Sequence, residues 1–133
     1  MIKFQDIKIG DYVQAEYEGK RWDGEVIGLQ KDQNLVQVLT SVQDFWFKPE
    51  HLFPIPLSIQ ALLKLNFKPT MVDDGSVKYM KGAFRLVTPT VHDDFSHFEM
   101  WYREDKRHNP HVHYIHELQN QYYDMTKVHL TAE

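Results

Sequence analysis

Histidine is concentrated near the C-terminal end of the chain. Four of the eight histidines fall within nine residues: His108, His111, His113 and His116. Two more stand upstream with a pair of acids: His92, Asp93, Asp94 and His97. Imidazole and carboxylate groups are ligands of zinc, nickel and iron. If residues 111–113 are extended and a helix follows, His111, His113 and His116 can converge, which predicts a metal site as one alternative.

The same histidines are also explained without a metal. Asn120 stands where a His-Glu-x-x-His zinc motif starting at His116 needs its second histidine. We therefore favour His116 as a packing residue that hydrogen-bonds a backbone carbonyl, and the other three as polar residues in or beside a loop. On this interpretation the protein holds no metal and no cofactor. The four-histidine site remains the alternative, and it would make the protein a His-dependent metal hydrolase.

Aromatic residues are frequent in the first 50 positions. They are Tyr12, Tyr17, Trp22, Phe45, Trp46 and Phe47. Three or four rings around one open pocket can bind a methylated cation, whereas the same rings can simply fill a small core. We expect Tyr17, Trp22 and one of the phenylalanines to meet. Tyr17, Trp22 and Trp46 are therefore candidate partner-binding residues.

A second candidate surface is basic. Its cations are Lys64, Lys68, Lys78, Lys81 and Arg85, with Tyr79 and Phe84 nearby in the sequence. Nucleic acid bases can stack on aromatic rings that lie between lysines. This strip therefore supports a second functional hypothesis, a nucleic-acid-binding accessory protein. The net charge of −4 and the isoelectric point of about 6.0 count against it.

Composition excludes several classes of protein. The chain has 133 residues, 42% of them hydrophobic and none of them cysteine. A folded core is therefore expected, whereas disulfides, zinc-thiolate sites and cysteine nucleophiles are excluded. The sequence contains no phosphate-binding glycine loop and no Gly-x-Ser-x-Gly motif, so we do not expect an enzyme. With no signal peptide and no apolar run of roughly 18 residues, a cytoplasmic protein away from membranes is expected.

The first half of the chain predicts short strands. Residues 12–17, 21–29, 35–40 and 45–47 have strand-like patterns, with Trp22, Gly24, Val26 and Gly28 assigned to one side of the second strand. Glu18-Gly19-Lys20 is a hairpin signal, and residues 49–52 resemble a single helical turn. Several short strands joined by tight turns indicate a small β-barrel.

The second half mixes helices and strands. Pro54 and Pro56 predict a stiff connector, and Ser58 is a plausible N-cap for a helix to about Asn66. Strands are expected within residues 77–80, 83–88 and 95–103, with a charged loop at residues 104–107. The tail from Lys127 onward is expected either to add strand-like residues or to fray.

The last helix is the clearest element. The stretch of residues 113–126 has an apolar stripe of Ile115, Leu118, Tyr122 and Met125. The helix could begin at Pro110, capped by Asn109, or near Tyr114 after a short strand at residues 111–113, and we favour the later start. Packing of the stripe leaves a polar face unexplained. That face makes four further partner-binding candidates: His116, Gln119, Asn120 and Tyr123.

Two resemblances follow from these patterns. GDYVQAEYEGKRWDGEVIGL, NLVQVL and DFWFKPEHLFPIP, within the first 55 residues, resemble SH3-like barrels of the Tudor kind. PIPLSIQALLKLNF, VKYMKGAFRL and HYIHELQNQYYDMT resemble uncharacterised small proteins of gut Bacteroidetes and their phages. Asn66 stands where that family has glycine, and Asn also accepts left-handed backbone geometry. This second resemblance implies architecture and phage context, but no activity.

Together these patterns predict an α+β fold in two parts. Residues 1–53 would form the SH3-like barrel, and residues 54–133 a helix, about three antiparallel strands and the C-terminal helix. The leading functional hypothesis is a non-enzymatic protein-interaction module of phage or mobile-element origin that binds or modulates a host factor. The oligomeric state stays open, since an exposed sheet edge can form a dimer.

Overall fold

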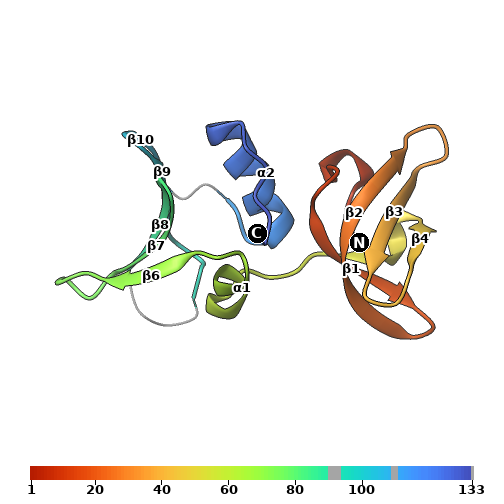
Figure 1. The fold of residues 1–133 in the computed structure, drawn as a ribbon, viewed down its shortest axis with the longest axis horizontal. Coiled ribbons are helices and arrows are strands. Elements are labelled where there is room, and N and C mark those ends of the chain that lie inside the picture. Colours follow the sequence, from red (N-terminus) through yellow and green to blue (C-terminus); the bar gives the residue numbers. More distant parts are fainter. Residues whose placement is uncertain (90–93, 109–110, 133) are drawn as a thin grey trace. The chain divides into compact units, whose positions relative to one another are not determined.

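The computed structural model describes residues 1–89, 94–108 and 111–132, except for the side chain of His108. The chain divides into two compact units. The first contains residues 1–56 and 114–120, and the second contains residues 57–113 and 121–133. The C-terminal helix α2 (Ile115–Thr126) therefore begins in the first unit and ends in the second (Figure 1). A division at residue 53 alone does not describe this arrangement, because the first turns of α2 belong with the first unit.

The first unit contains a five-stranded antiparallel sheet. Its strands are β1 (Tyr12–Tyr17), β2 (Lys20–Gln30), β3 (Leu35–Thr40), β4 (Asp44–Phe47) and β5 (Leu52–Phe53). Their order is β4-β3-β2-β1-β5, and β4 and β5 are not hydrogen-bonded to each other, so the described sheet is open at both edges. Two 3-10 turns accompany it, η1 (Phe4–Asp6) and η2 (Pro49–His51).

Local turn chemistry explains the first hairpin. Glu18 and Gly19 form its two-residue loop, and both have positive φ, 52° and 76°. Such turns match the twist of the strands that they join. The pairing of β2 with β3 shifts in register between Val26 and Gly28. Residues of β2 after this shift therefore face the opposite side of the sheet from the side that strict alternation predicts. The expectation that Gly28 shares a face with Trp22 is wrong for this reason.

The core of the first unit is mainly aliphatic. It consists of Ile2, Ile7, Val13, Ala15, Val26, Val36, Val38, Phe47 and Leu52. Ile2 and Ile7 bring the N-terminal segment into this core. The backbone N–H of Ile115 donates to the carbonyl of Ile55 at 2.8 Å, which ties the start of α2 to the connector. Glu117 caps that start by accepting from the N–H of Tyr114 at 3.1 Å, so the later start of the helix is confirmed.

The second unit opens with helix α1 (Ile59–Lys64), capped as expected by the Ser58 hydroxyl, which accepts from the N–H of Ala61. Asn66 has a φ of 66°, the left-handed geometry expected of it. A five-stranded antiparallel sheet follows, in the order β10-β9-β8-β7-β6. Its strands are β6 (Lys68–Met71), β7 (Val77–Lys81), β8 (Phe84–Thr88), β9 (Glu99–Tyr102) and β10 (Asp105–His108).

Two of these five strands contradict the sequence expectations. The predicted charged loop at residues 104–107 is wrong, because β10 occupies most of it and pairs with β9. The turn between them contains Arg103 with a φ of 56°. Strand β6 begins two residues after Asn66 and pairs with β7. Both missed strands lie at the edges of the sheet, where polar residues and Pro69 are tolerated.

One face of the second sheet is buried. Its inward side chains are Val77, Tyr79, Phe84, Leu86 and Met100. The Tyr122 ring packs on Phe84 with 4.7 Å between ring centroids. The Lys81 ammonium donates to the carbonyls of Leu65 and Thr131, both at 2.8 Å, and Leu130 is buried, so the C-terminal tail is held. Neither described helix has the length and apolarity that a bilayer span requires.

Candidate functional site

Four aromatic side chains of the first unit share one face of its sheet. Trp22 pairs across the strands with Ala15, a core residue, and Tyr17 lies two positions further along β1 from Ala15. Phe45 pairs with Val38 and Phe47 pairs with Val36, and both valines are fully buried. Directly paired residues point to the same face, and so do residues two apart on a strand. All four rings therefore lie on the core side of the sheet.

These rings surround a hollow of about 350 Å³ between the β1–β2 and β3–β4 turns. We call it the aromatic hollow, and its aromatic lining is Tyr17, Trp22, Phe45 and Phe47. The ring centroids of Tyr17 and Phe45 are 4.8 Å apart, and those of Phe45 and Phe47 are 6.1 Å apart. Glu18 and Lys20 also line it, beside the hairpin turn. The expected meeting of Tyr17, Trp22 and a phenylalanine is thus present.

The core does not account for all of these rings. Tyr17 is 40% exposed and Trp22 is half-buried, and neither belongs to the buried cluster of the unit. The buried cluster consists of eight aliphatic residues and Phe47. Aromatic area left beside an open hollow is therefore available to a ligand.

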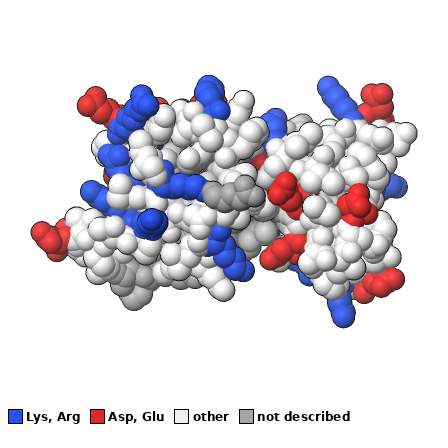
Figure 2. Space-filling view, in the orientation of Figure 1, with Lys and Arg blue, Asp and Glu red and all other residues white. Residues whose placement is uncertain are grey.

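The surroundings of the aromatic hollow are acidic. The first unit contains six Lys and Arg residues against ten Asp and Glu residues, so it carries the whole net charge of −4. Acidic side chains are prominent on the face of this unit that Figure 2 shows. A second hollow of about 550 Å³ shares Tyr17, Glu18, Phe45 and Phe47 and adds two carboxylates, Glu16 and Glu50, together with Lys48 and His51. Carboxylates and ring faces together favour a cationic ligand.

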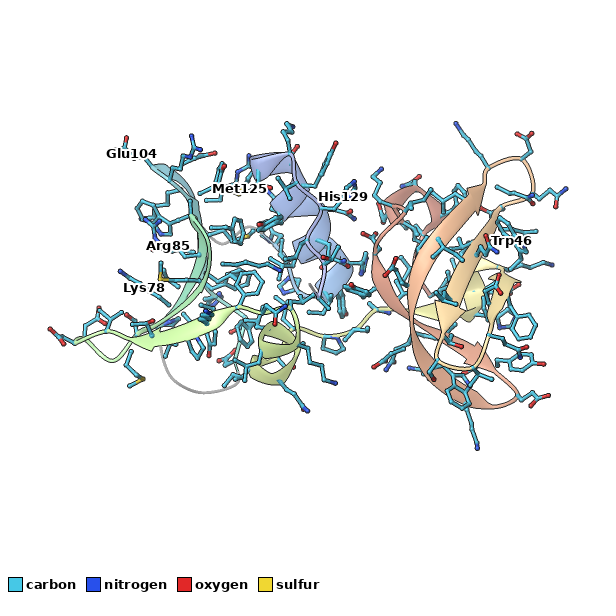
Figure 3. The ribbon with its side chains drawn as sticks, in the orientation of Figure 1. Trp46, Lys78, Arg85, Glu104, Met125 and His129 are labelled. Atoms are coloured by element: carbon cyan, nitrogen blue, oxygen red, sulfur yellow. The ribbon has the colours of Figure 1, made fainter. Side chains whose placement is uncertain are left out.

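Trp46, labelled in Figure 3, is placed differently from the other candidates. It pairs with Gln37 on the opposite face of β4 from its neighbours Phe45 and Phe47. A methyl group added at Gly28 would lie 3.2 Å from the Trp46 ring, so the indole covers that glycine. Trp46 lines the second hollow but not the aromatic hollow.

The polar face of α2 is used inside the protein. The Gln119 side chain accepts from the N–H of Tyr12 at 2.7 Å and donates to the carbonyl of Gly10 at 2.9 Å. The Asn120 amide donates to the Asp6 carbonyl and to the Asp11 carboxylate, each at 3.3 Å. Gln119 and Asn120 therefore hold the first turns of α2 against residues 6–12 of the same unit. Tyr123 is 42% exposed and stacks on His129 with 4.6 Å between ring centroids.

Two ionisable groups are buried in the first unit. Asp11 is 3% exposed, and burial raises the pKa of its carboxyl to about 7, although hydrogen bonds from Lys8 and Asn120 act in the opposite direction. His116 is 5% exposed, and burial lowers the pKa of its imidazole. The Nδ1 atom of His116 has no hydrogen-bond partner among the described residues. The sequence predicted His116 as a packing residue, and its burial agrees with that, whereas the burial of Asp11 was not predicted.

The histidine cluster is not assembled by the described residues. His111, His113 and His97 are exposed, whereas His116 is buried. His92, Asp93 and the side chain of His108 lie outside the described residues. Within residues 1–89, 94–107 and 111–132, no group of three or more possible ligand side chains could hold a metal ion. The metal alternative receives no support from the part of the chain that the structure describes.

The expected basic strip is corrected by the register of the second sheet. Tyr79 and Phe84 are buried on the inner face, at 2% and 0% exposure, and Lys81 faces the same way. Lys64 lies on α1. Lys68, Lys78 and Arg85 share the outer face, where strand pairing adds Trp101 and Lys106. Those last two were missed because β10 was expected to be a loop.

Comparison of the chain with known protein families, with curated proteins and with solved structures found no match. The function of the aromatic hollow is therefore inferred from the residues that line it.

Proposed function

We propose that the protein is a non-enzymatic interaction module whose aromatic hollow binds a methylated lysine side chain of a partner protein. One observation carries the proposal. Tyr17, Trp22, Phe45 and Phe47 line a single hollow of about 350 Å³, and Glu18 stands beside it. Ring faces attract a cation, and a methylated ammonium loses less hydration on entering an apolar site than an unmodified ammonium does.

The negative charge of the first unit supports the proposal that the partner is cationic. The first unit is acidic, so it attracts basic segments over a distance set by the salt concentration. The second hollow shares residues with the aromatic hollow, and its three carboxylates, Glu16, Glu18 and Glu50, outnumber its one lysine, Lys48. It can therefore accept a basic residue that neighbours the methylated one. Asp11 contributes less to this attraction than its formal charge suggests, because burial raises the pKa of its carboxyl to about 7.

The architecture of the first unit also supports the resemblance to Tudor-like domains. The first unit is a sheet of five antiparallel strands, and the 3-10 turn η2 stands just before β5, where the sequence predicted a single helical turn. Small barrels of short strands joined by tight turns share these features. From the resemblance to gut Bacteroidetes and phage proteins we further propose that such a module acts in a bacterial cytoplasm, where it would bind or modulate a host factor. Fold likeness alone does not identify that factor.

The test uses three basic peptides that differ at one side chain. They carry trimethyl-lysine, its neutral tert-butyl isostere, or unmodified lysine. Titration calorimetry on the full chain should show the trimethyl-lysine peptide binding about tenfold more tightly than the isostere, since only the former is a cation. Trp22→Leu should abolish this preference. Trp46→Leu is the matched control and should keep it, because Trp46 does not line the aromatic hollow.

Three outcomes would contradict the proposal. Equal binding of trimethyl-lysine and its isostere would show an apolar contact without cation recognition. Loss of binding in Trp46→Leu but not in Trp22→Leu would move the site to the second hollow. No binding of any peptide at millimolar concentration by a folded protein would remove the hollow as a cation site.

A further inference from the structure

The second sheet has one buried face and one face that no described element of its unit covers. We call the latter the outer face, and its strand residues are Lys68, Thr70, Lys78, Met80, Arg85, Val87, Glu99, Trp101 and Lys106. In Figure 3, Lys78 and Arg85 lie on the side of the sheet opposite the C-terminal half of α2. An antiparallel sheet with one buried face normally has polar residues on its other face. Apolar and aromatic residues on the outer face are therefore informative about what it could bind.

Strand register places the key residues in one row. Lys68 pairs with Met80, Met80 with Arg85, Arg85 with Trp101 and Trp101 with Lys106. The row crosses all five strands. Four interstrand spacings of about 4.8 Å give it a length of roughly 19 Å. A linear ligand lying across the strands would therefore meet cations at both ends and a ring and a guanidinium between them.

Trp101 is held in place by its neighbours. The guanidinium carbon of Arg85 lies 4.8 Å from the ring centroid, and the Lys106 ammonium lies 5.2 Å from it. The indole N–H donates to the Glu99 carboxylate at 3.3 Å. Glu99 also pairs with Lys106 at 3.0 Å. Bases stack both on aromatic rings and on guanidinium planes, so Trp101 and Arg85 form a prepared stacking surface.

Charge is segregated onto this face. The second unit as a whole has nine Lys and Arg residues against nine Asp and Glu residues. Among the described strand residues of the outer face, four are cations and one, Glu99, is an anion. Figure 2 shows Lys and Arg side chains gathered over this unit. A neutral unit with such a face is complementary to a polyanion.

We infer that the outer face binds a single strand of nucleic acid, with bases stacked on Trp101 and Arg85 and phosphates near Lys68, Lys78 and Lys106. Duplex DNA is disfavoured by shape. Its major groove is about 12 Å wide, which admits a helix or a two-stranded ribbon but not a flat face of roughly 19 Å. RNA and DNA single strands share the recognised chemistry. This inference does not depend on the aromatic hollow of the first unit.

The test is fluorescence anisotropy of labelled 12-nucleotide probes, oligo(U) and oligo(dT), with a duplex of the same length as the reference. Both single strands should bind more tightly than the duplex, and the difference between them decides between RNA and DNA as the preferred ligand. Affinity should fall with salt at a slope of roughly −2 to −3 for three to four phosphate contacts. Trp101→Thr should weaken binding about tenfold or more, because it removes the ring.

Matched variants distinguish binding at the outer face from attraction to the protein's charge in general. Lys78→Gln and Lys64→Gln remove the same charge, but Lys64 is on α1. Lys78→Gln should weaken binding about threefold and reduce the salt slope by about 0.7, whereas Lys64→Gln should do neither. Trp101→Phe keeps a ring and should retain most of the affinity. Thermal unfolding of each variant verifies that it is folded.

Several results would overturn the inference. Equal effects of Lys64→Gln and Lys78→Gln would show unlocalised charge attraction. Tighter binding of the duplex than of either single strand would contradict the stacking surface. Displacement of the probe by polyglutamate at the same charge concentration would show that any polyanion suffices, with an acidic protein as the better candidate. Unchanged binding by a folded Trp101→Thr variant would show that bases do not stack on Trp101.

Discussion

The Gln119 side chain of α2 accepts a hydrogen bond from the backbone N–H of Tyr12, the first residue of β1, at 2.7 Å. Its amide nitrogen donates to the carbonyl of Gly10 at 2.9 Å, so one side chain satisfies a donor and an acceptor of the same segment. Gln119 is 4% exposed. Gln119 of α2 therefore takes the place of a neighbouring strand as the hydrogen-bond partner of the Gly10 carbonyl and the Tyr12 N–H.

Gln119→Leu should destabilise the protein by roughly 1–3 kcal/mol, because it removes the hydrogen-bond partner of a partly buried backbone N–H and of a partly buried carbonyl. Urea unfolding followed by circular dichroism measures this change. Gln60→Leu, at an exposed position of α1, is the control and should change stability by less than about 0.5 kcal/mol. Equal effects of the two substitutions would show that the Gln119 hydrogen bonds contribute nothing.

Asp11 should make the protein less stable as pH rises. Its pKa is raised from 3.8 to about 7, so the folded state holds a proton that the unfolded state releases. Its contribution to stability is therefore complete below pH 3.8 and is lost as pH rises to about 7. A shift of three pKa units corresponds to roughly 4 kcal/mol. Asp11→Asn should remove this dependence and be more stable than the unsubstituted protein at pH 8. If the two proteins lose stability in parallel between pH 4 and pH 8, Asp11 is not the group responsible.

His116 should act in the opposite direction. Burial lowers the pKa of its imidazole below 6.5, so the unfolded state binds a proton that the folded state does not. Its stabilising contribution is present above pH 6.5 and is lost as pH falls through the lowered pKa. His116→Gln should therefore lose less stability than the unsubstituted protein between pH 7 and pH 5. His97→Gln, at an exposed position, is the control. A steeper acid loss in His116→Gln would show that the imidazole is charged in the folded state.

Sequence patterns predicted the elements that local chemistry determines. Strand β1 follows its alternation, the Glu18-Gly19 turn has positive φ at both residues, and Asn66 has the geometry expected of it. The β3 strand was equally clear, because its buried Val36 and Val38 alternate with less buried residues. In each case a few consecutive residues determine the local structure, so it can be predicted without knowledge of tertiary contacts.

The remaining features depend on contacts between distant segments. β5 has two residues, which is too short for any periodicity, and it exists because it pairs with β1. β10 is charged and becomes a strand because β9 provides a partner. Gly28 changes face because of a register shift that its own residue type does not require. The role of Gln119 depends on Tyr12, 107 positions earlier. The rings of the aromatic hollow were named from the sequence, but the separation of Tyr17 and Trp22 from the buried core was not.

Glu18 connects stability with the proposed function. It is not a glycine, yet its φ is 52°, a geometry that costs a residue with a Cβ roughly 1 kcal/mol and that Asn tolerates better. Its side chain also lines the aromatic hollow. Glu18→Asn creates the favoured Asn-Gly turn, so it should raise the free energy of unfolding by about 0.5–1 kcal/mol. The same substitution removes a carboxylate beside the hollow, so it should weaken binding of the trimethyl-lysine peptide severalfold.

Urea unfolding and peptide titration on the same Glu18→Asn sample separate the two effects. Glu18→Gln is the control, because it removes the charge but keeps a long side chain in the strained geometry. It should weaken peptide binding as Glu18→Asn does, without the gain in stability. If Glu18→Asn stabilises the protein while both variants bind the peptide at full strength, the carboxylate has no part in recognition. Glu18 would then be a suboptimal turn residue, and cation binding would have to rest on the rings alone.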